Sequence, residues 1–550
     1  MIVADAIVET LRREGVTTFF GFPTTPMIEA AVAGGLRPVI CRQERGGVHM
    51  ADGFARVTNG KPVGVFALQQ GGGAEHAFAG VASAFSDSTP ILLLPLGFEL
   101  GQAQVFPWFS SARGYASVTK SVETIMQPEH TADVMRRAFN ALRNGRPGPV
   151  MVEVPCDLVG REIPGGAGEY RRVRAAKAVP DAHDVDAAAK LLLAAASPMI
   201  LAGQGVLYAE ASEELVQLAE LLQAPVMTTV DGKSAFPEDH PLSLGSGGNG
   251  FTGAGSLFLH DRADVILALG AGLTRHPLST PTLPDRVKLI HNTIDVRDLY
   301  KAYETEIGLL GDARLTLQQL IAAVTDRLGG KAVERSPAAE IARARASWLA
   351  KWQAKLTAET APISPYRVIA EFQQVVDTAD VIMTHDSGSP REQLLPFYQA
   401  KRPRGYLGWG KSHSLGTGLG LNIGAKIAAP DKFCVNIMGD AAFGMIGLDF
   451  ETAVRCGVPI LTIVFNNSTM ACEIPHMELS HARHRTRDLG GNYAALARDM
   501  GGWSERVEHP GQIGEAILRA RRQTEEGKAC LLEFITSEET AYSQKDAARP

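Results

Sequence analysis

The stretch from residue 433 to 469 reads FCVNIMGDAAFGMIGLDFETAVRCGVPILTIVFNNST. It contains two apolar runs, 433–438 and 460–465, separated by a segment expected to form a helix over about 446–456. Apolar strands without polar alternation are typical of a parallel sheet buried on both faces, and a helix is the usual crossover between two such strands. The stretch therefore predicts a β-α-β unit with Asp440 and Asn467 at the ends of its two strands.

The same rhythm of strands and helices recurs along the 550 residues. It predicts an α/β protein of three doubly wound parallel-sheet domains, over residues 1–165, 190–330 and 360–540. A Pro- and Gly-rich linker separates the first two, and a helix over 338–357 precedes the third. The polar stretch 538–550 is expected to be a mobile tail.

The composition excludes several classes of protein. Hydrophobic residues make up 45% of the chain and charged residues 21%, which is enough apolar material for a core in each domain. A formal net charge of −6 argues against a nucleic-acid partner. The apolar runs are too short to span a membrane, and the first residues lack a signal-peptide pattern. Six dispersed cysteines fit a reducing, cytoplasmic setting.

Asp440 and Asn467 are expected to lie close together, because neighbouring parallel strands end at the same edge of a sheet. One carboxylate, one amide oxygen and a nearby main-chain carbonyl are hard oxygen ligands that suit Mg²⁺ or Ca²⁺. Mg²⁺ held by so few protein groups usually takes its other ligands from phosphates and water. The small residues Ala441 and Ala442 let backbone N–H groups approach a phosphate at the helix start. We therefore expect a Mg²⁺-diphosphate site here.

This pattern resembles the cofactor motif of thiamine-diphosphate-dependent enzymes, which begins Gly-Asp-Gly and ends Asn-Asn. Here the motif reads Gly-Asp-Ala at 439–441 and Asn-Asn at 466–467. The resemblance implies that Asp440 and Asn467 bind Mg²⁺ through their side chains and Thr469 through its main-chain oxygen. The residues that it places against the cofactor in this stretch are Gly439, Asp440, Ala441, Ala442 and Asn467.

A second part of the resemblance lies near the N-terminus. Residues 42–56 read RQERGGVHMADGFAR and resemble the glutamate-bearing stretch of acetohydroxyacid synthases. Glu44 falls at the catalytic position, where a carboxylic acid shares a proton with the pyrimidine ring of the cofactor and promotes loss of the thiazolium C2 proton. Read alone, Glu44 is an acidic residue at a helix start. The Asp440 motif makes the catalytic interpretation preferable.

A third part precedes the motif. Residues 415–425, LGTGLGLNIGA, resemble the family's Met-Gly-x-Gly-Leu-Pro-x-Ala-Ile-Gly-Ala, with glycine in place of proline at 420. By resemblance, Leu415 is the apolar support over which the cofactor bends, and the carbonyl of His413 faces its 4′-amino group. The loop 386–389 follows a predicted strand and is expected to meet the diphosphate through Ser387 and Gly388.

The resemblance covers nearly the whole chain. It implies a pyrimidine-binding domain (1–165), a central Rossmann-like domain (190–330) and a diphosphate-binding domain (360–540). In the family the site lies between the first domain of one subunit and the third domain of another. Glu44 and Asp440 would then act from different subunits, in a homodimer or homotetramer.

Two branches of the superfamily share most with this chain. The leading interpretation is a carbon–carbon lyase or carboligase near the 2-hydroxyacyl-CoA lyases and oxalyl-CoA decarboxylases, because residues 71–76 and Glu99 resemble theirs. Its substrate would be a small oxo- or hydroxy-acyl compound, as a CoA thioester. The alternative is an acetolactate synthase-like carboligase that uses pyruvate, because residues 42–56, 118–120 and 225–245 resemble those enzymes. Gly272 stands where that branch usually has arginine.

Two other functions stay open from the sequence. A non-catalytic relative could keep the fold as a nucleotide sensor, and a dinucleotide-dependent oxidoreductase could share the α/β pattern. The turn Gly203-Gln204-Gly205 could hold ADP, CoA or FAD in the central domain, or nothing, because a single GxG is a weak signal. His481 and His484 are expected on a solvated loop. The residues expected to contact substrate are Gln69, Gln70, His76, Glu473 and His476.

Overall fold

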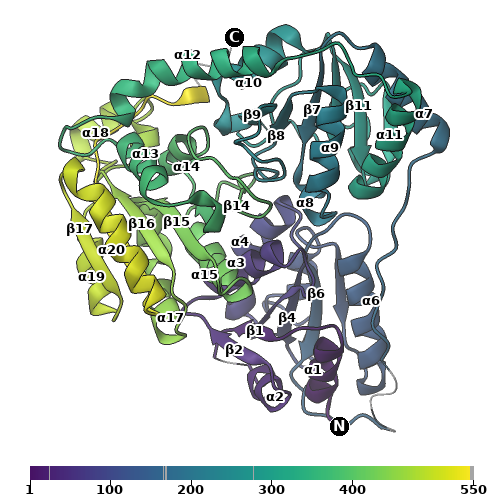
Figure 1. Cartoon of the computed structure of the whole chain (residues 1–550). Coiled ribbons are helices and arrows are strands. Elements are labelled where there is room, and N and C mark those ends of the chain that lie inside the picture. Colours follow the sequence, from purple (N-terminus) through teal and green to yellow (C-terminus); the bar gives the residue numbers. More distant parts are fainter. Residues whose placement is uncertain (24, 165, 167–169, 277, 545–550) are drawn as a thin grey trace.

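Three six-stranded sheets, in which all neighbouring strands are parallel, form the computed structural model of this chain (Figure 1). The structure describes residues 1–550 except 24, 165, 167–169, 277 and 545–550. Helices cover both faces of each sheet, which confirms the predicted α/β fold class. Each of the ranges 1–165, 190–330 and 360–540 contains one sheet, and the domain boundaries themselves stay a prediction. Among the described residues, no helix is long and apolar enough to cross a membrane.

The first domain has the strand order β2-β1-β3-β4-β6-β5. Its strands are continuous buried runs in the middle of the sheet, as in β3, β4 and β6, because helices pack on both sides. The strands are β1 (Thr18–Gly21), β2 (Arg37–Ile40), β3 (Gly64–Leu68), β4 (Ile91–Gly97), β5 (Ser121–Thr124) and β6 (Val150–Pro155). The helices are α1 (Val3–Arg13), α2 (Met27–Ala33), α3 (Glu44–Val57), α4 (Gly72–Ser86), α5 (Ser111–Tyr115) and α6 (Thr131–Arg143).

The central domain has the order β12-β11-β10-β7-β8-β9, which is the strand order of dinucleotide-binding domains. The chain direction across the sheet reverses between β7 and β10. The strands are β7 (Pro198–Ala202), β8 (Val226–Thr228), β9 (Ser243–Ser246), β10 (Val265–Leu269), β11 (Lys288–Thr293) and β12 (Ile307–Leu310). The helices are α7 (Ala182–Ala194), α8 (Gln204–Tyr208), α9 (Ser212–Leu222), α10 (Gly253–Leu257) and α11 (Ala313–Leu328).

The third domain has the order β14-β13-β15-β16-β18-β17, which repeats the topology of the first domain. The strands are β13 (Val381–His385), β14 (Tyr406–Leu407), β15 (Phe433–Gly439), β16 (Leu461–Asn466), β17 (Trp503–Val507) and β18 (Cys530–Ile535). The helices of this part are α12 (Ala338–Leu356), α13 (Pro365–Val375), α14 (Ser389–Leu394), α15 (Gly418–Ala428), α16 (Asp440–Ile446), α17 (Phe450–Arg455), α18 (Glu478–His484), α19 (Tyr493–Asp499) and α20 (Ile513–Glu525).

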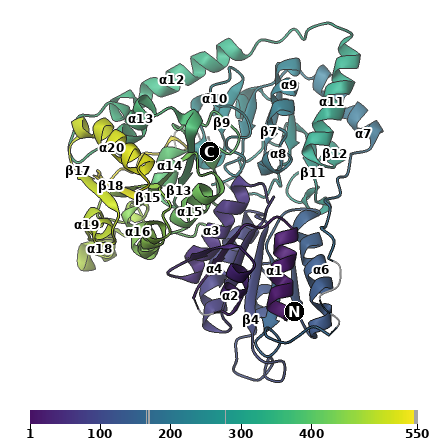
Figure 2. The same cartoon turned by 60° about the horizontal axis from the view of Figure 1, so that its bottom comes forward.

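Helices α3 and α15 join the first and third domains, and they lie side by side in the core of the molecule (Figures 1 and 2). Glycines make their close approach possible. A Cβ added to Gly53 would lie 2.1 Å from the carbonyl oxygen of Leu421, and one added to Gly424 would lie 1.9 Å from that of Met50. Any larger side chain at these positions would push the two helices apart.

Three local expectations are wrong. The crossover helix starts at Asp440 rather than near 446, and a turn at 447–449 divides it into α16 and α17. Residues 538–544 are not a mobile tail, because Tyr542 and Ser543 are buried and Ser543 donates a hydrogen bond to the carbonyl oxygen of Phe251 (2.6 Å). The rest of that expected tail, 545–550, lies outside the described residues. His481 and His484 lie on the short helix α18 rather than on a loop.

Candidate functional site

The two side chains predicted to bind metal lie at one edge of the third sheet. Strands β15 and β16 pair up to Gly439 and Phe465, so Asp440 and Asn467 follow at neighbouring strand ends. The Asp440 carboxylate accepts hydrogen bonds from the N–H groups of Ala441 and Ser468, each at 2.8 Å. The carboxylate therefore lies against the loop that carries Asn467, as one shared ion requires.

The donors at this edge fit a divalent cation. Burial raises the pKa of the Asp440 carboxyl to about 6, and hydrogen bonds from backbone N–H groups oppose this only in part. A bound cation would supply the positive charge that stabilises the ionised form. The amide oxygen of Asn467 accepts the N–H of Thr469 (3.1 Å), which orders the loop. Among the described residues no cluster of three or more His, Cys, Asp or Glu side chains offers a metal site.

Asp440 and Asn467 open into a cavity of the third domain. Most of the residues predicted to bind cofactor, and two of those predicted to contact substrate, share this cavity. Its lining also includes Arg391 and Cys472, which sequence reasoning did not single out. The predicted residues in the lining are Ser387, Gly388, His413, Leu415, Gly439, Asp440, Ala441, Ala442, Asn467, Thr469, Glu473 and His476.

Asp386 organises the part of the cavity that carries Leu415. Its buried carboxylate accepts the N–H groups of Ser387 (2.8 Å), Gly416 (2.9 Å) and Gly418 (2.8 Å). Burial raises the pKa of Asp386 to about 6, against the effect of these bonds. The residue joins the 386–389 loop to the start of α15. Its place at the end of an apolar strand was the signal in the sequence for this role.

A second group of predicted residues gathers in the first domain. Glu44 opens α3, is 3% exposed, and its Oε2 lies 3.3 Å from Nδ1 of His76. A Cβ added to Gly73 would lie 3.3 Å from Oε1 of Glu44 and 2.7 Å from Cγ of Gln69. Glu44, Gln69 and His76 therefore meet around the start of α4. Gln70 is half-buried and follows Gln69 before that helix.

The two groups are separate within one chain. The start of α3 contacts the third domain, because the N–H of Arg42 bonds to Asp449 (2.7 Å) and Gly46 lies against the same carboxylate. Among the described residues that line the third-domain cavity, however, none comes from the group around Glu44. The two groups of predicted residues thus lie at separate places in the chain.

Another cavity lies between the central and first domains, at the reversal point of the central sheet. The turns 203–205 and 270–272 after β7 and β10 line it on one side, and first-domain residues such as Arg146 line it on the other. A Cβ on Gly203 would lie 2.4 Å from the carbonyl oxygen of Gly270, and one on Gly205 would lie 2.7 Å from its Cα. These glycines are explained by contact between the two turns, whether or not a ligand binds. The cavity beside them lies where ligands bind in such sheets.

Comparison with known families agrees with this geometry. The thiamine pyrophosphate enzyme N-terminal TPP binding domain matches residues 1–107, the central domain of the same enzymes matches 185–320, and their C-terminal TPP binding domain matches 386–534. The chain therefore belongs to the thiamine pyrophosphate enzyme family, and it is a thiamine-diphosphate-dependent enzyme.

Several curated relatives align over almost the full chain. A probable acetolactate synthase large subunit of Methanocaldococcus jannaschii is 30% identical over 94% of this chain and 89% of its own length. The acetolactate synthase isozyme 3 large subunit of Escherichia coli is 27% identical over 94% and 92%. A sulfoacetaldehyde acetyltransferase of Alcaligenes xylosoxydans xylosoxydans is 29% identical over 98% and 94%.

The matches confirm the predicted superfamily of thiamine-diphosphate-dependent enzymes. The relatives also bear on which of the two predicted reactions this chain resembles more. The relatives support the acetolactate synthase-like alternative better than the leading 2-hydroxyacyl-CoA lyase interpretation, since several carry the former name.

Proposed function

We propose that this protein is an acetolactate synthase-like carboligase that uses pyruvate with thiamine diphosphate and Mg²⁺. The observation that carries the proposal is the third-domain cavity, which combines the Asp440 and Asn467 oxygens with Leu415. Relatives named as acetolactate synthase large subunits, aligned along nearly the whole chain, support the choice of reaction.

The residues of this chain have distinct tasks in the proposed reaction. Asp440, Asn467 and the main-chain oxygen of Thr469 would hold Mg²⁺ and, through it, the diphosphate. Leu415 would support the cofactor, and the carboxyl group of Glu44 would hold a proton beside its pyrimidine ring. When bound, thiamine diphosphate supplies a carbanion that adds to a carbonyl and then takes up electrons.

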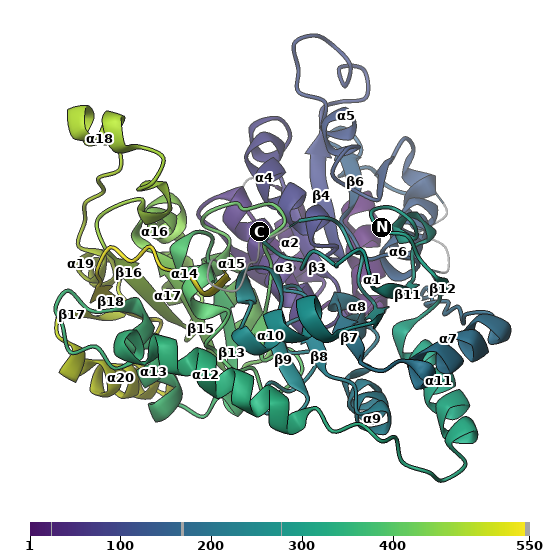
Figure 3. The same cartoon turned by 90° about the horizontal axis from the view of Figure 1, so that it is seen from above.

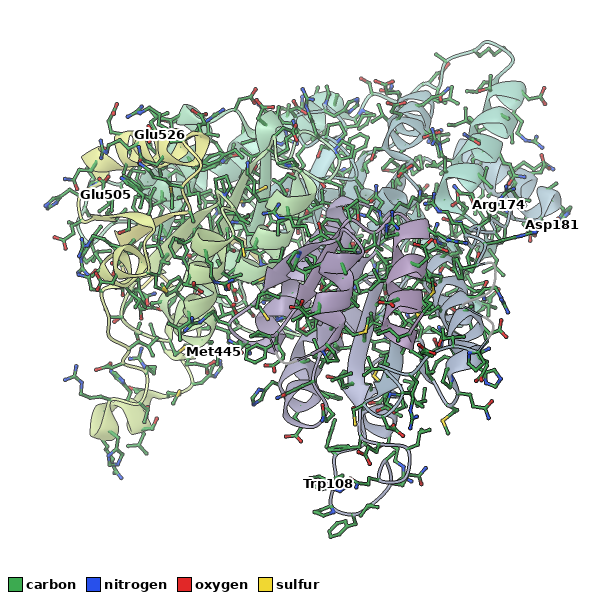
Figure 4. All side chains as sticks on the ribbon, turned by 90° about the horizontal axis from the view of Figure 1, so that it is seen from below. Trp108, Arg174, Asp181, Met445, Glu505 and Glu526 are labelled. Atoms are coloured by element: carbon green, nitrogen blue, oxygen red, sulfur yellow. The ribbon has the colours of Figure 1, made fainter. Side chains whose placement is uncertain are left out.

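The proposed active unit is a homodimer, and a homotetramer is a dimer of such dimers. A second copy would bring its Glu44 group to the cavity of the first. Phe106 is 93% exposed and Trp108 is 51% exposed on a loop of the first domain, and Leu479 of α18 is 65% exposed. This loop and α18 project from the same face of the molecule (Figures 3 and 4). Exposed apolar side chains of this size are typical of an interface.

The central cavity is the proposed site of a second ligand with an adenine nucleotide part, either ADP, CoA or FAD. Its position at the reversal between β7 and β10 supports this. The full GxGxxG pattern is missing, because Tyr208 stands at the third glycine position. Native mass spectrometry of the purified protein identifies the ligand, and a spectrum with no nucleotide or flavin mass removes this part of the proposal.

The test of the main proposal is one assay with competing substrates. The purified protein is incubated with thiamine diphosphate and Mg²⁺ and with pyruvate, a 2-hydroxyacyl-CoA or sulfoacetaldehyde, and products are read by mass spectrometry. We expect acetolactate from pyruvate. Formyl-CoA from the acyl-CoA, with no acetolactate, would restore the lyase interpretation. Turnover of sulfoacetaldehyde alone would favour an acetyltransferase like the Alcaligenes relative.

A further inference from the structure

The segment 411–413, between β14 and α15, touches all three domains. The hydroxyl of Ser412 lies 2.8 Å from that of Ser83 in the first domain. The ammonium group of Lys411 pairs with Asp231 of the central domain, and its N–H bonds to Asp87 of the first domain at 3.4 Å. The next residue is thereby held at the junction of the three domains.

That residue, His413, meets His276 of the central domain. Their Nε2 atoms lie 2.9 Å apart, and the rings are tilted by 45° with centroids 4.8 Å apart. Two imidazole nitrogens at hydrogen-bond distance need one proton between them, because two protons would clash and two lone pairs would repel. The protonation states of the two rings are therefore linked.

His276 is held in place by its own loop. Its Nδ1 lies 3.2 Å from the hydroxyl oxygen of Ser279, and its carbonyl oxygen accepts the N–H groups of Ser279 (3.0 Å) and Thr280 (2.9 Å). When Nδ1 of His276 donates its proton to Ser279, its Nε2 is left as an acceptor. His413 then carries its proton on Nε2 and has a lone pair on Nδ1.

His413 belongs to the lining of the cofactor cavity, together with Leu415, Glu473 and His476. Among the described residues, the side chain of His413 makes its hydrogen bond through Nε2, to His276. The series Ser279, His276, His413 therefore ends at a residue of the cavity wall, whose Nδ1 is left for a bound molecule.

Charged groups from each neighbouring element act on the pair. Burial lowers the pKa of both histidines; Lys411 and Arg391 lower that of His276 further, and Arg391 lowers that of His413. Asp231 and Asp87 act in the opposite direction. The pair is therefore neutral at pH 7. When it accepts one proton, the lowered pKa favours release of that proton from the imidazolium.

We propose that His413 is a further catalytic residue, which exchanges a proton with the substrate oxygen at Nδ1, and that His276 is a positioning residue that fixes its tautomer. This inference rests on the proposed function, whose acid and base toward substrate were unassigned. Nδ1 takes the proton of a hydroxyl as the product carbonyl forms. It returns that proton to the carbonyl oxygen of the next substrate. Because two pyruvate anions and one proton give acetolactate and CO2, each turnover also takes up one proton from solvent, which the acceptor's carbonyl oxygen receives.

The kinetic test uses the holoenzyme with pyruvate between pH 5 and 9. His413→Gln is expected to lower kcat about 100-fold and to remove the acidic limb of its pH profile, since a well-placed general acid–base group contributes roughly 10²–10⁴-fold. KM and thiamine-diphosphate affinity stay near the wild-type values. His276→Gln keeps the limb but shifts its midpoint. His183→Gln, an exposed histidine on α7, is the matched control and changes neither.

A second measurement uses unmodified protein and needs no turnover. Nitrogen-15 NMR of the histidine rings is expected to show one protonated and one bare Nε2 in this pair. Two protonated Nε2 atoms, or a wild-type kcat and pH profile in His413→Gln, would overturn the inference. A wild-type enzyme that leaves pyruvate unchanged would instead overturn the proposed function, and the NMR result then decides the inference alone.

Discussion

The first and third domains share one topology and carry different parts of the proposed site. With strands numbered in chain order within each domain, both sheets have the order 2-1-3-4-6-5. In the first domain the functional carboxylate, Glu44, follows the second strand. In the third domain Asp386 follows the first strand and Asp440 the third. The shared fold supplies an edge where strands end, and the residues after particular strands determine what that edge binds.

The two halves also differ in how they are held. Asp440 is oriented by N–H groups of its own helix and of the next strand's loop, within 30 residues. Glu44 is oriented by packing of α3 against the loop and helix that carry Gln69 and His76. This difference fits the proposed roles, in which the third domain anchors the cofactor and the first takes part in proton transfer. Four measurements test or refine this comparison.

The largest effect is expected for Asp440→Ala. Loss of the only carboxylate among the proposed metal ligands should weaken thiamine-diphosphate retention by about 100-fold or more. Gel filtration in chelator, followed by cofactor analysis, measures it. Asp449→Asn, a similarly buried carboxylate that contacts α3 instead, should retain cofactor. Unchanged cofactor content in the alanine variant would mean that the third domain is not the anchoring half.

Glu44→Gln is expected to separate binding from chemistry. The amide keeps the shape of the side chain but cannot share a proton, so exchange of the cofactor C2 proton should slow by roughly 10²–10⁴-fold while cofactor stays bound. Hydrogen–deuterium exchange followed by NMR gives the rate. Exchange at the wild-type rate would remove Glu44 from its proposed role and leave the first domain without a catalytic part.

The contact between the two domains is tested by Gly53→Ala. The new methyl group would meet the Leu421 carbonyl oxygen, and overpacking of this kind costs about 1–3 kcal/mol of unfolding free energy. Gly444→Ala in α16 is the control, since a Cβ there has no atom within 4 Å. Alanine in a helix is about 0.5–1 kcal/mol more favourable than glycine. The unfolding free energy of each variant is measured by urea unfolding. Equal values for the two variants would mean that α3 and α15 pack less tightly than the structure shows.

The smallest effect concerns pH. His49 is fully buried between α3 and α15, and burial lowers its pKa to about 3, below the ordinary value of 6.5. The folded chain then binds fewer protons than the unfolded chain, so its unfolding free energy falls as the pH drops below 6.5, by about 1.4 kcal/mol per pH unit. His49→Gln should show a slope smaller by that amount between pH 6 and 4.5. Identical slopes would contradict a neutral His49 at the interface.

The sequence predicted the parts of the site that are local in the chain. The end of an apolar strand, an acidic residue and small residues at a helix start suffice to place Asp440, because backbone geometry alone brings these groups together. The same holds for the parallel sheets, whose strands lack polar alternation. Gln69 and His76 were also candidates, but no spacing rule joined them to Glu44.

Only the tertiary structure brought together what the chain keeps apart. His276 and His413 are 137 residues apart and meet at one pair of nitrogens. Within residues 538–544, a stretch polar enough to suggest a tail, Tyr542 and Ser543 are buried because they find partners on other segments. Periodicity and composition predict the local structure of each segment, that is, its strands, helices and turns. The burial and charge of a side chain depend on which distant segments pack against it, and this is set when the three domains meet.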